Sequence, residues 1–152
     1  MALSTTFPIK RALVRLVRDS APLKAALVGG IHQRLSPRKV RFPYLVYSEV
    51  SAPFVSDWGA GGDNGRREID ALYDLDIYDV DSSRAESLLE QLDGLLNGPG
   101  AASALAVEGQ TVLLVETRAK TPMGPDRDAV GRRIDRVGIT VHIQTDQPIP
   151  AV

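Results

Sequence analysis

The strongest constraint on the fold is an alternation of apolar and polar residues in two stretches of the chain. In EIDALYDLDIY (68–78), every odd-numbered residue is apolar or aromatic, and acids occupy most of the even positions. In VGITVHIQ (137–144), every odd-numbered residue is Val or Ile. A period of two places successive side chains on opposite faces of a strand. Both stretches are therefore predicted to be strands of a sheet whose apolar face packs on helices and whose polar face turns outward.

The remaining pattern predicts a single α+β domain over residues 1–152. PYLVYSEV (43–50) and TVLLVETR (111–118) are typical of two further strands. Apolar residues at helical spacing predict a helix ending near Asp19, a short one from Pro22, and one opened by a Ser83–Glu86 capping box. Glycine and proline predict flexible loops at 53–65 and 119–129 and a loosely held tail at 146–152. We expect one mostly antiparallel sheet of about four strands with helices on one face, in the order α-(α)-β-β-α-β-β.

Composition narrows the class of protein. The 152 residues are 43% apolar with a net charge of -1, which is ordinary for one globular domain. With no cysteine the chain has no disulfide or thiolate metal site. No apolar run approaches the roughly 20 residues of a membrane span. Basic residues between 10 and 18 interrupt any signal-peptide core. We therefore expect a protein made in the cytoplasm, with no membrane partner.

Charge is distributed unevenly along the chain. Residues 1–41 contain nine Lys or Arg and one acid, whereas residues 42–97 contain twelve acids and three Arg. Segregated charge of this kind predicts oppositely charged surfaces. For the basic N-terminal segment alone, a solvated helix face is the simpler interpretation.

Four carboxylates on the polar side of 68–78 form what we call the acidic row: Glu68, Asp70, Asp74 and Asp76. Such a row can bind a divalent metal, pair across the sheet with Arg132 and Arg136, or face water or a pore. A calcium loop is disfavoured, because Tyr78 takes its third ligand position and no glycine follows. We favour a solvated or pore-facing surface that costs little stability when neutralised.

Catalytic patterns are weak. The predicted positions of His32, in a loop, and His142, on a strand, have no metal-ligand spacing. GAGGDNG (59–65) has Asn64 where a dinucleotide-binding loop requires glycine. No phosphate loop or nucleophile elbow is present. We expect no enzymatic activity, no cofactor and no metal, and leave open whether Trp58 packs on the domain or anchors a partner.

In order along the chain, three segments resemble the tail-terminator (tail-completion) proteins of long-tailed bacteriophages. They are ALVRLVRDSAPLKAALVGGIHQRLSPRKVRFPYLVYSEV (12–50), REIDALYDLDIYDVDSSRAESLLEQLDGLL (67–96) and RRIDRVGITVHI (132–143). The first is similar to that family's helix, short helix and glycine turn before a P-Y-[LV]-V-Y strand. The second and third are similar to its central strand and helix and its closing strand. The similarity lies in the order and spacing of these elements.

The resemblance implies a structural virion protein located in the tail or neck region. Such proteins form a ring, usually a hexamer, at the head-proximal end of the tail tube, where they stop tube polymerisation and join the head. The expected partners are further copies of the chain, the tail tube protein, a connector or stopper protein, and genomic DNA passing through the pore without sequence-specific binding.

On this interpretation the acidic row faces the pore, where it would repel the DNA backbone. The two loops are expected to bind partners, through Phe54, Asp57, Trp58, Lys120, Met123 and Arg127. Two alternatives remain, another neck or stopper protein of the same particle and a carboxylate-metal enzyme that uses the aspartates.

Overall fold

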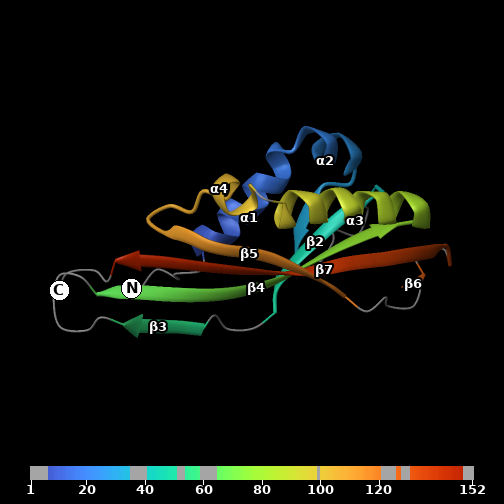
Figure 1. Cartoon of the computed structure of the whole chain (residues 1–152). Helices are drawn as coiled ribbons and strands as arrows, with labels where there is room; N and C mark the ends of the chain where they lie inside the picture. Colours follow the sequence, from blue (N-terminus) through green and yellow to red (C-terminus); the bar gives the residue numbers. More distant parts are fainter. Residues whose placement is uncertain are drawn as a thin grey trace.

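The computed structural model describes residues 7–34, 41–50, 54–58, 65–98, 100–120, 126–127 and 131–148. Figure 1 shows the helices gathered on one side of a long twisted sheet. The elements in chain order are α1 (Phe7–Asp19), α2 (Ala21–Ala26), β1 (Ile31–Gln33), β2 (Tyr44–Glu49), β3 (Phe54–Trp58), β4 (Arg66–Asp79), α3 (Ser82–Asn97), α4 (Ala101–Ala104), β5 (Thr111–Ala119), β6 (Asp126–Arg127) and β7 (Arg133–Pro148). In this part of the chain, no helix is long and apolar enough to cross a membrane.

The sheet confirms the expected α+β class. Its strand order is β1-β2-β4-β7-β5, with β3 paired to β4 and β6 paired to β7. The β1–β2 pairing is parallel and every other pairing is antiparallel. The four expected strands correspond to β2, β4, β5 and β7. The sheet also contains three short strands that were not predicted: β1, β3 and β6.

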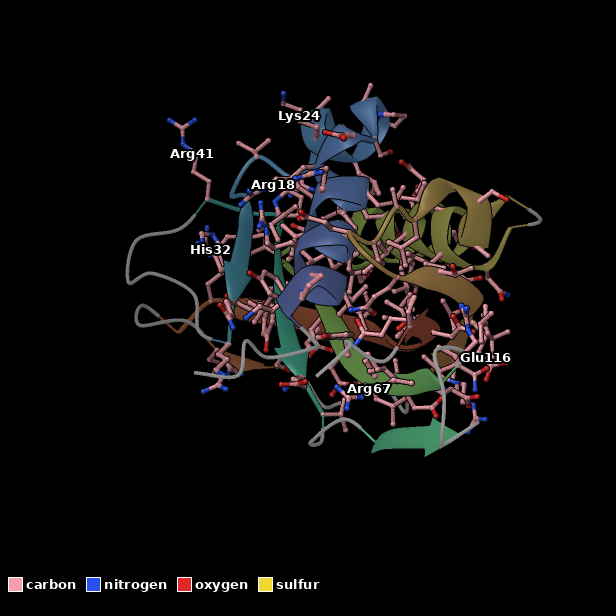
Figure 2. All side chains as sticks on the ribbon, turned by 90° about the vertical axis from the view of Figure 1, so that its left-hand side faces the viewer. Arg18, Lys24, His32, Arg41, Arg67 and Glu116 are labelled. Atoms are coloured by element: carbon pink, nitrogen blue, oxygen red, sulfur yellow. The ribbon has the colours of Figure 1, made fainter. Side chains whose placement is uncertain are left out.

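The centre of the sheet is the antiparallel pair of β4 and β7. Their register runs without a break from Arg66 opposite Pro148 to Asp79 opposite Asp135. Because β7 occupies one edge of β4 throughout, β2 and β3 share the other edge: β3 pairs with its first half and β2 with its second. Figure 2 shows the two outer sides of the molecule, with His32 of β1 on one and Glu116 of β5 on the other.

The core lies between the sheet and the helices. Every odd-numbered residue of β4 from 69 to 77 is at most 1% exposed, as the alternation predicted. The helices contribute the matching apolar faces, including Ile9, Leu13 and Val17 of α1 and Leu88, Leu92 and Leu96 of α3. The opposite face of the sheet is therefore the polar one.

Several expected boundaries were wrong. Part of the predicted 53–65 loop is the strand β3, and part of the 119–129 loop is β6. The predicted tail begins too early, because β7 continues to Pro148 and Asp146 is buried. His32 lies on β1 and not in a loop. In β3, β6 and the end of β7, pairing with a long neighbouring strand outweighs the local turn signals, whereas β1 pairs with the six-residue strand β2.

The start of α3 also differs from the expected capping box. The N-cap is Asp81, whose carboxylate accepts a hydrogen bond from the backbone N–H of Arg84 at 3.1 Å. The helix thus begins at Ser82, before Ser83 can act as the cap. Asp, Ser and Ser occur in succession here and all favour the N-cap position, so local preference alone does not select among them.

Candidate functional site

The polar face of the sheet is where the sequence placed its candidate site. It consists of the even-numbered side chains of β4, which lie opposite the helices, and the side chains of β7 and β5 in register with them. The structure brings all four members of the acidic row onto this face. It also gives each of them a partner, so the row is not a bare band of negative charge.

The partners of the acidic row come mainly from β7, directly across or one diagonal step away. Such neighbours on one face of an antiparallel pair are within side-chain reach. The resulting hydrogen bonds join Glu68 to Gln144, Asp70 to His142, Asp74 to Thr140 and Asp76 to Arg136. Two of these four partners carry or can carry positive charge, and the other two are neutral donors.

Asp76 is the most enclosed member of the row. Its residue is 5% exposed, and its carboxylate accepts hydrogen bonds from Arg136 Nη2 and Lys120 Nζ, both at 2.9 Å. Lys120 also lies 3.1 Å from a carboxylate oxygen of Asp74. Asp76 is therefore not solvated as we expected, and its contact with Arg136 matches the alternative in which the acidic row pairs across the sheet.

Gly138 is what allows Asp76 to sit so deep. It lies directly opposite Asp76 in the β4–β7 register. A Cβ atom added there would stand 2.1 Å from Asp76 Oδ1 and 2.8 Å from the backbone oxygen of Leu75. The missing side chain thus forms the space that the carboxylate fills. A single glycine inside a strict Val/Ile alternation was the sequence signal for this close approach.

Arg136 lies against an aromatic ring at one end of the polar face. Its guanidinium carbon lies 5.5 Å from the centroid of the Tyr78 ring, and Tyr44 of β2 stacks on that ring at 5.0 Å. A guanidinium over an aromatic face is attracted by the ring quadrupole. Arg136 is thereby held against both the ring and Asp76.

His142 lies between two carboxylates at the middle of the polar face. Its Nε2 is 2.7 Å from Asp70 on β4 and its Nδ1 is 3.2 Å from Glu116 on β5. Burial alone would lower the pKa of His142, but hydrogen bonds and charge from Asp70 and Glu116 outweigh it, so the pKa is raised. The protonated ring, which donates from both nitrogens, is the form that fits this geometry.

This geometry predicts a pH-dependent contribution to stability. A raised pKa means that the contribution is complete below the unfolded value of about 6.5 and is lost as the pH rises through the folded value. In His142→Gln, urea unfolding should lose that pH dependence, with a change of at most about 1 kcal/mol, the usual size of a partly exposed ion pair. Glu116→Gln should lower the pKa of His142 in an NMR titration. A ring that titrates below the ordinary histidine value in the unmodified protein would contradict this account.

A second cluster of charge lies where β4 meets α3, on the helix side of the sheet. Asp79 is 0% exposed, and its carboxylate accepts hydrogen bonds from Nε and Nη2 of Arg84, each at 2.5 Å. It also accepts the backbone N–H groups of Val80 and Asp81, at 2.7 and 3.3 Å. Burial would raise the pKa of Asp79, but the Arg84 contacts and the two backbone donors together lower it. The cluster fixes the turn from strand to helix.

Of the six residues expected to bind partners, two have described side chains, Lys120 and Arg127. Lys120 belongs to the polar face through Asp74 and Asp76. Arg127 is exposed and donates to the backbone oxygen of Gly131 at 2.9 Å. Residues 54–58 are paired with Arg66–Asp70 of β4. The side chains of Phe54, Asp57 and Trp58, and all of Met123, lie outside the described residues.

Sequence reasoning missed three contributors to the polar face: the enclosing role of Gly138, the ion pairs of Lys120, and the salt bridge between Arg66 and Asp146. The last two join segments that are far apart in the sequence, so no local pattern indicates them. Among the described residues, no group of three or more His, Asp or Glu side chains is arranged to hold a metal ion.

Comparison with known proteins gives a fold similarity without a family. No protein-family model matches the sequence, and no curated protein is detectably similar to it. Among solved structures, the chain is similar to one from a structure described as "Virion of native gene transfer agent (GTA) particle". The identity is 13% and the TM-score 0.63, over 95% of this chain and 99% of the other. At that identity the similarity concerns the fold alone.

Proposed function

We propose that the chain is a non-enzymatic structural protein of a phage-like virion. The observation that carries the proposal is the fold similarity to a chain of a gene transfer agent virion, which extends over nearly the whole of both chains. The similarity therefore compares the two chains over nearly their whole given lengths. The virion is the location that this similarity favours.

Within the particle, the proposed role is a tail terminator. Copies of the chain form a ring, most simply of six, on the head-proximal end of the tail tube, where they stop tube growth and join the neck. The order of sequence elements supports this role. Segregated charge also supports a ring, because one chain with oppositely charged sides can close by repeated head-to-tail contacts.

The polar face suits a channel that DNA crosses without being held. Affinity for DNA comes largely from Lys and Arg that neutralise phosphates. Here Arg136 and Lys120 are already paired with Asp76, and Arg66 with Asp146. A surface whose cations are occupied by its own carboxylates offers few free partners to phosphate. On this proposal the acidic row keeps the channel wall from gripping DNA, through mutual pairing more than through bare repulsion.

A stopper or other neck protein of the same particle is the second candidate, and the fold similarity supports both roles equally. A particle lacking the chain distinguishes them by electron microscopy. If the chain is the terminator, its loss should produce tail tubes of uncontrolled length and heads without tails. Loss of a stopper should leave tails of normal length and heads that release their DNA.

Native mass spectrometry of the purified chain, and of tails that carry it, provides the second measurement. A closed ring is the expected result. If both the chain alone and the assembled tails contain only monomers or dimers of it, the terminator proposal is wrong. Normal particles formed without the chain would contradict any structural role.

A further inference from the structure

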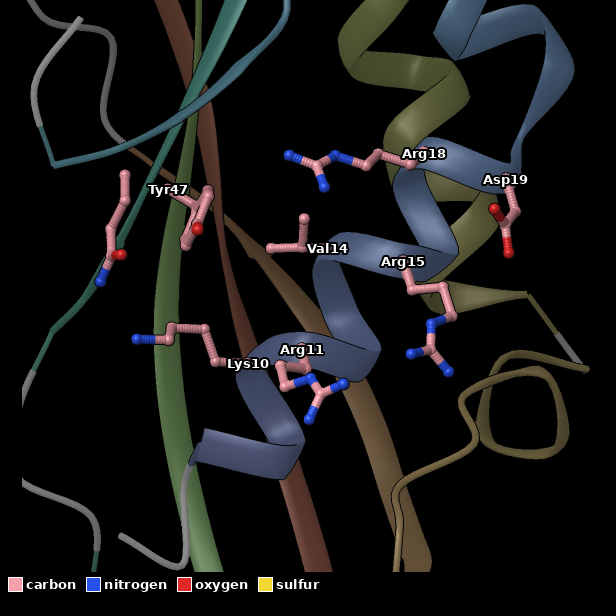
Figure 3. Close-up of a pocket in the computed structure, with 8 residues that line it drawn as sticks. Lys10, Arg11, Val14, Arg15, Arg18, Asp19 and Tyr47 are labelled. Atoms are coloured by element: carbon pink, nitrogen blue, oxygen red, sulfur yellow. The ribbon is translucent and has the colours of Figure 1, made fainter.

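A groove between α1 and the edge of the sheet is lined by four cations and one acid. Its volume is about 430 Å³. Val14 and Tyr47 contribute its apolar surface and Asp19 its single acid, whereas four cations come from α1. Figure 3 shows Lys10 and Arg18 extending from α1 toward the strand that carries Tyr47. The lining residues are Lys10, Arg11, Val14, Arg15, Arg18, Asp19, Gln33 and Tyr47.

The two cations nearer the C-terminal end of α1 have no acidic partner in the described part of this chain. Arg15 and Arg18 are both exposed, and neither forms a hydrogen bond or salt bridge with another described residue. Together with Arg11 they recur at i, i+4 and i+7, which places them along one stripe of the helix. The stripe runs over seven helical steps from its first residue to its last, or about 10 Å.

An acidic stripe of the same spacing lies on α3. Glu86, Glu90 and Asp93 also recur at i, i+4 and i+7. Glu86 and Glu90 are exposed, and Asp93 accepts a hydrogen bond from Thr117 of β5. No Lys or Arg occurs between Arg84 and Arg118. The acidic stripe therefore has no positive charge interspersed along the helix, and its Asp93 end lies against β5.

The two stripes lie toward opposite sides of one protomer. The basic groove borders β1, the edge strand at one end of the sheet order, through Gln33. The helix α3 lies over β4, β7 and β5, and β5 is the edge at the other end. A contact between opposite sides requires a second copy of the chain. Repeated from copy to copy, such a contact is heterologous and can close into a ring.

We propose that the basic groove beside α1 of one copy receives the acidic stripe of α3 from the next copy. The inference rests on the proposed ring and identifies the surfaces that build it. Equal spacing of the opposed charges and the apolar contribution of Val14 and Tyr47 favour a helix as the occupant.

Charge reversal tests the contact. The basic-reversed variant is Arg15→Glu with Arg18→Glu, and the acid-reversed variant is Glu86→Lys with Glu90→Lys. Each variant should weaken self-association by about tenfold or more, because like charges meet at every contact. Sedimentation velocity and native mass spectrometry at low salt measure the loss, and circular dichroism checks that both variants are folded.

Mixing the two variants is the sharper measurement. In a ring that alternates them, glutamates of one meet lysines of the other at one contact, and native charges meet at the next. An equimolar mixture should therefore recover association, as should one chain that carries all four substitutions. The matched control, Arg41→Glu with Arg133→Glu, makes the same charge change at exposed arginines outside both stripes and should associate normally.

The outcomes separate this contact from the ring itself. If the reversed variants form rings like the unmodified chain, or if the mixture fails to recover, the contact is wrong while the ring proposal stands. If the unmodified chain forms no ring alone or on tails, both proposals fail. If the basic-reversed variant assembles normally but loses binding to a short DNA duplex, the groove holds nucleic acid and the contact is overturned.

Discussion

Asp76→Asn should lower the free energy of unfolding by roughly 2–3 kcal/mol, because it leaves two cations facing a neutral amide in a nearly enclosed site. Asp76 is 5% exposed, and both Arg136 and Lys120 direct hydrogen bonds to its carboxylate. The value lies below that for a fully buried pair, since the side chains of Lys120 and Arg136 are 18% and 25% exposed and can regain some water. Urea unfolding at neutral pH measures the loss.

Asp74→Asn is the matched control for that substitution. The side chain of Asp74 is 25% exposed. In the variant, the amide oxygen of Asn can still accept the hydrogen bond from Thr140, and Lys120 remains paired with Asp76. The expected cost is about 1 kcal/mol or less. Gly138→Ala should reproduce the larger effect without changing any charge, because the added methyl displaces the Asp76 carboxylate. Equal small losses in all three variants would contradict the enclosed ion-pair account.

Asp79→Asn should cost about 2 kcal/mol, since it removes a buried anion from two backbone N–H groups and from Arg84, whose side chain is 46% exposed and can regain water. The lowered pKa of Asp79 adds a pH signature. The carboxylate contributes its full stability above the unfolded value of about 3.9, and that contribution is lost as the pH falls through the folded value. The variant should therefore be less stable at pH 7 and lose less stability on acidification, by urea unfolding across pH 2–7.

Asp81→Asn separates this effect from helix capping. Asparagine is about as good an N-cap as aspartate, so the change at Asp81 should be small even though it lies two residues from Asp79. If the two variants lose stability equally, the Arg84 cluster has no special weight and the cap alone holds the start of α3.

The long strands were predictable because their side-chain period reports burial directly. Alternation around Tyr73 and Val141 identifies β4 and β7 and assigns their faces without knowledge of any partner. The same argument fails for β1, whose three residues are too few to show a period and whose parallel pairing depends on β2. It also fails for β3, where neighbouring glycines indicate a loop and β4 provides the edge that makes a strand.

The sequence predicted where the candidate site lies on the sheet, but not which of its carboxylates is buried and paired. The sequence placed Asp74 and Asp76 on the same face as equivalent positions, and the structure confirms the shared face. The residues that make Asp76 more buried than Asp74 lie elsewhere in the chain. Gly138 leaves room opposite one of them, and Lys120 approaches from the end of β5. Burial of a polar side chain depends on such tertiary neighbours, which no local pattern contains.

The uninterrupted pairing of β4 with β7 gives the molecule a mechanical direction. Antiparallel hydrogen bonds lie perpendicular to the strands, so tension applied along this pair from its two ends loads the whole row in shear. The row runs from Arg66 opposite Pro148 to Asp79 opposite Asp135, and many bonds must give way together. The short edge strand β1, held by three register positions, peels one bond at a time. The domain is thus stiffer along its central pair than at the edge beside α1.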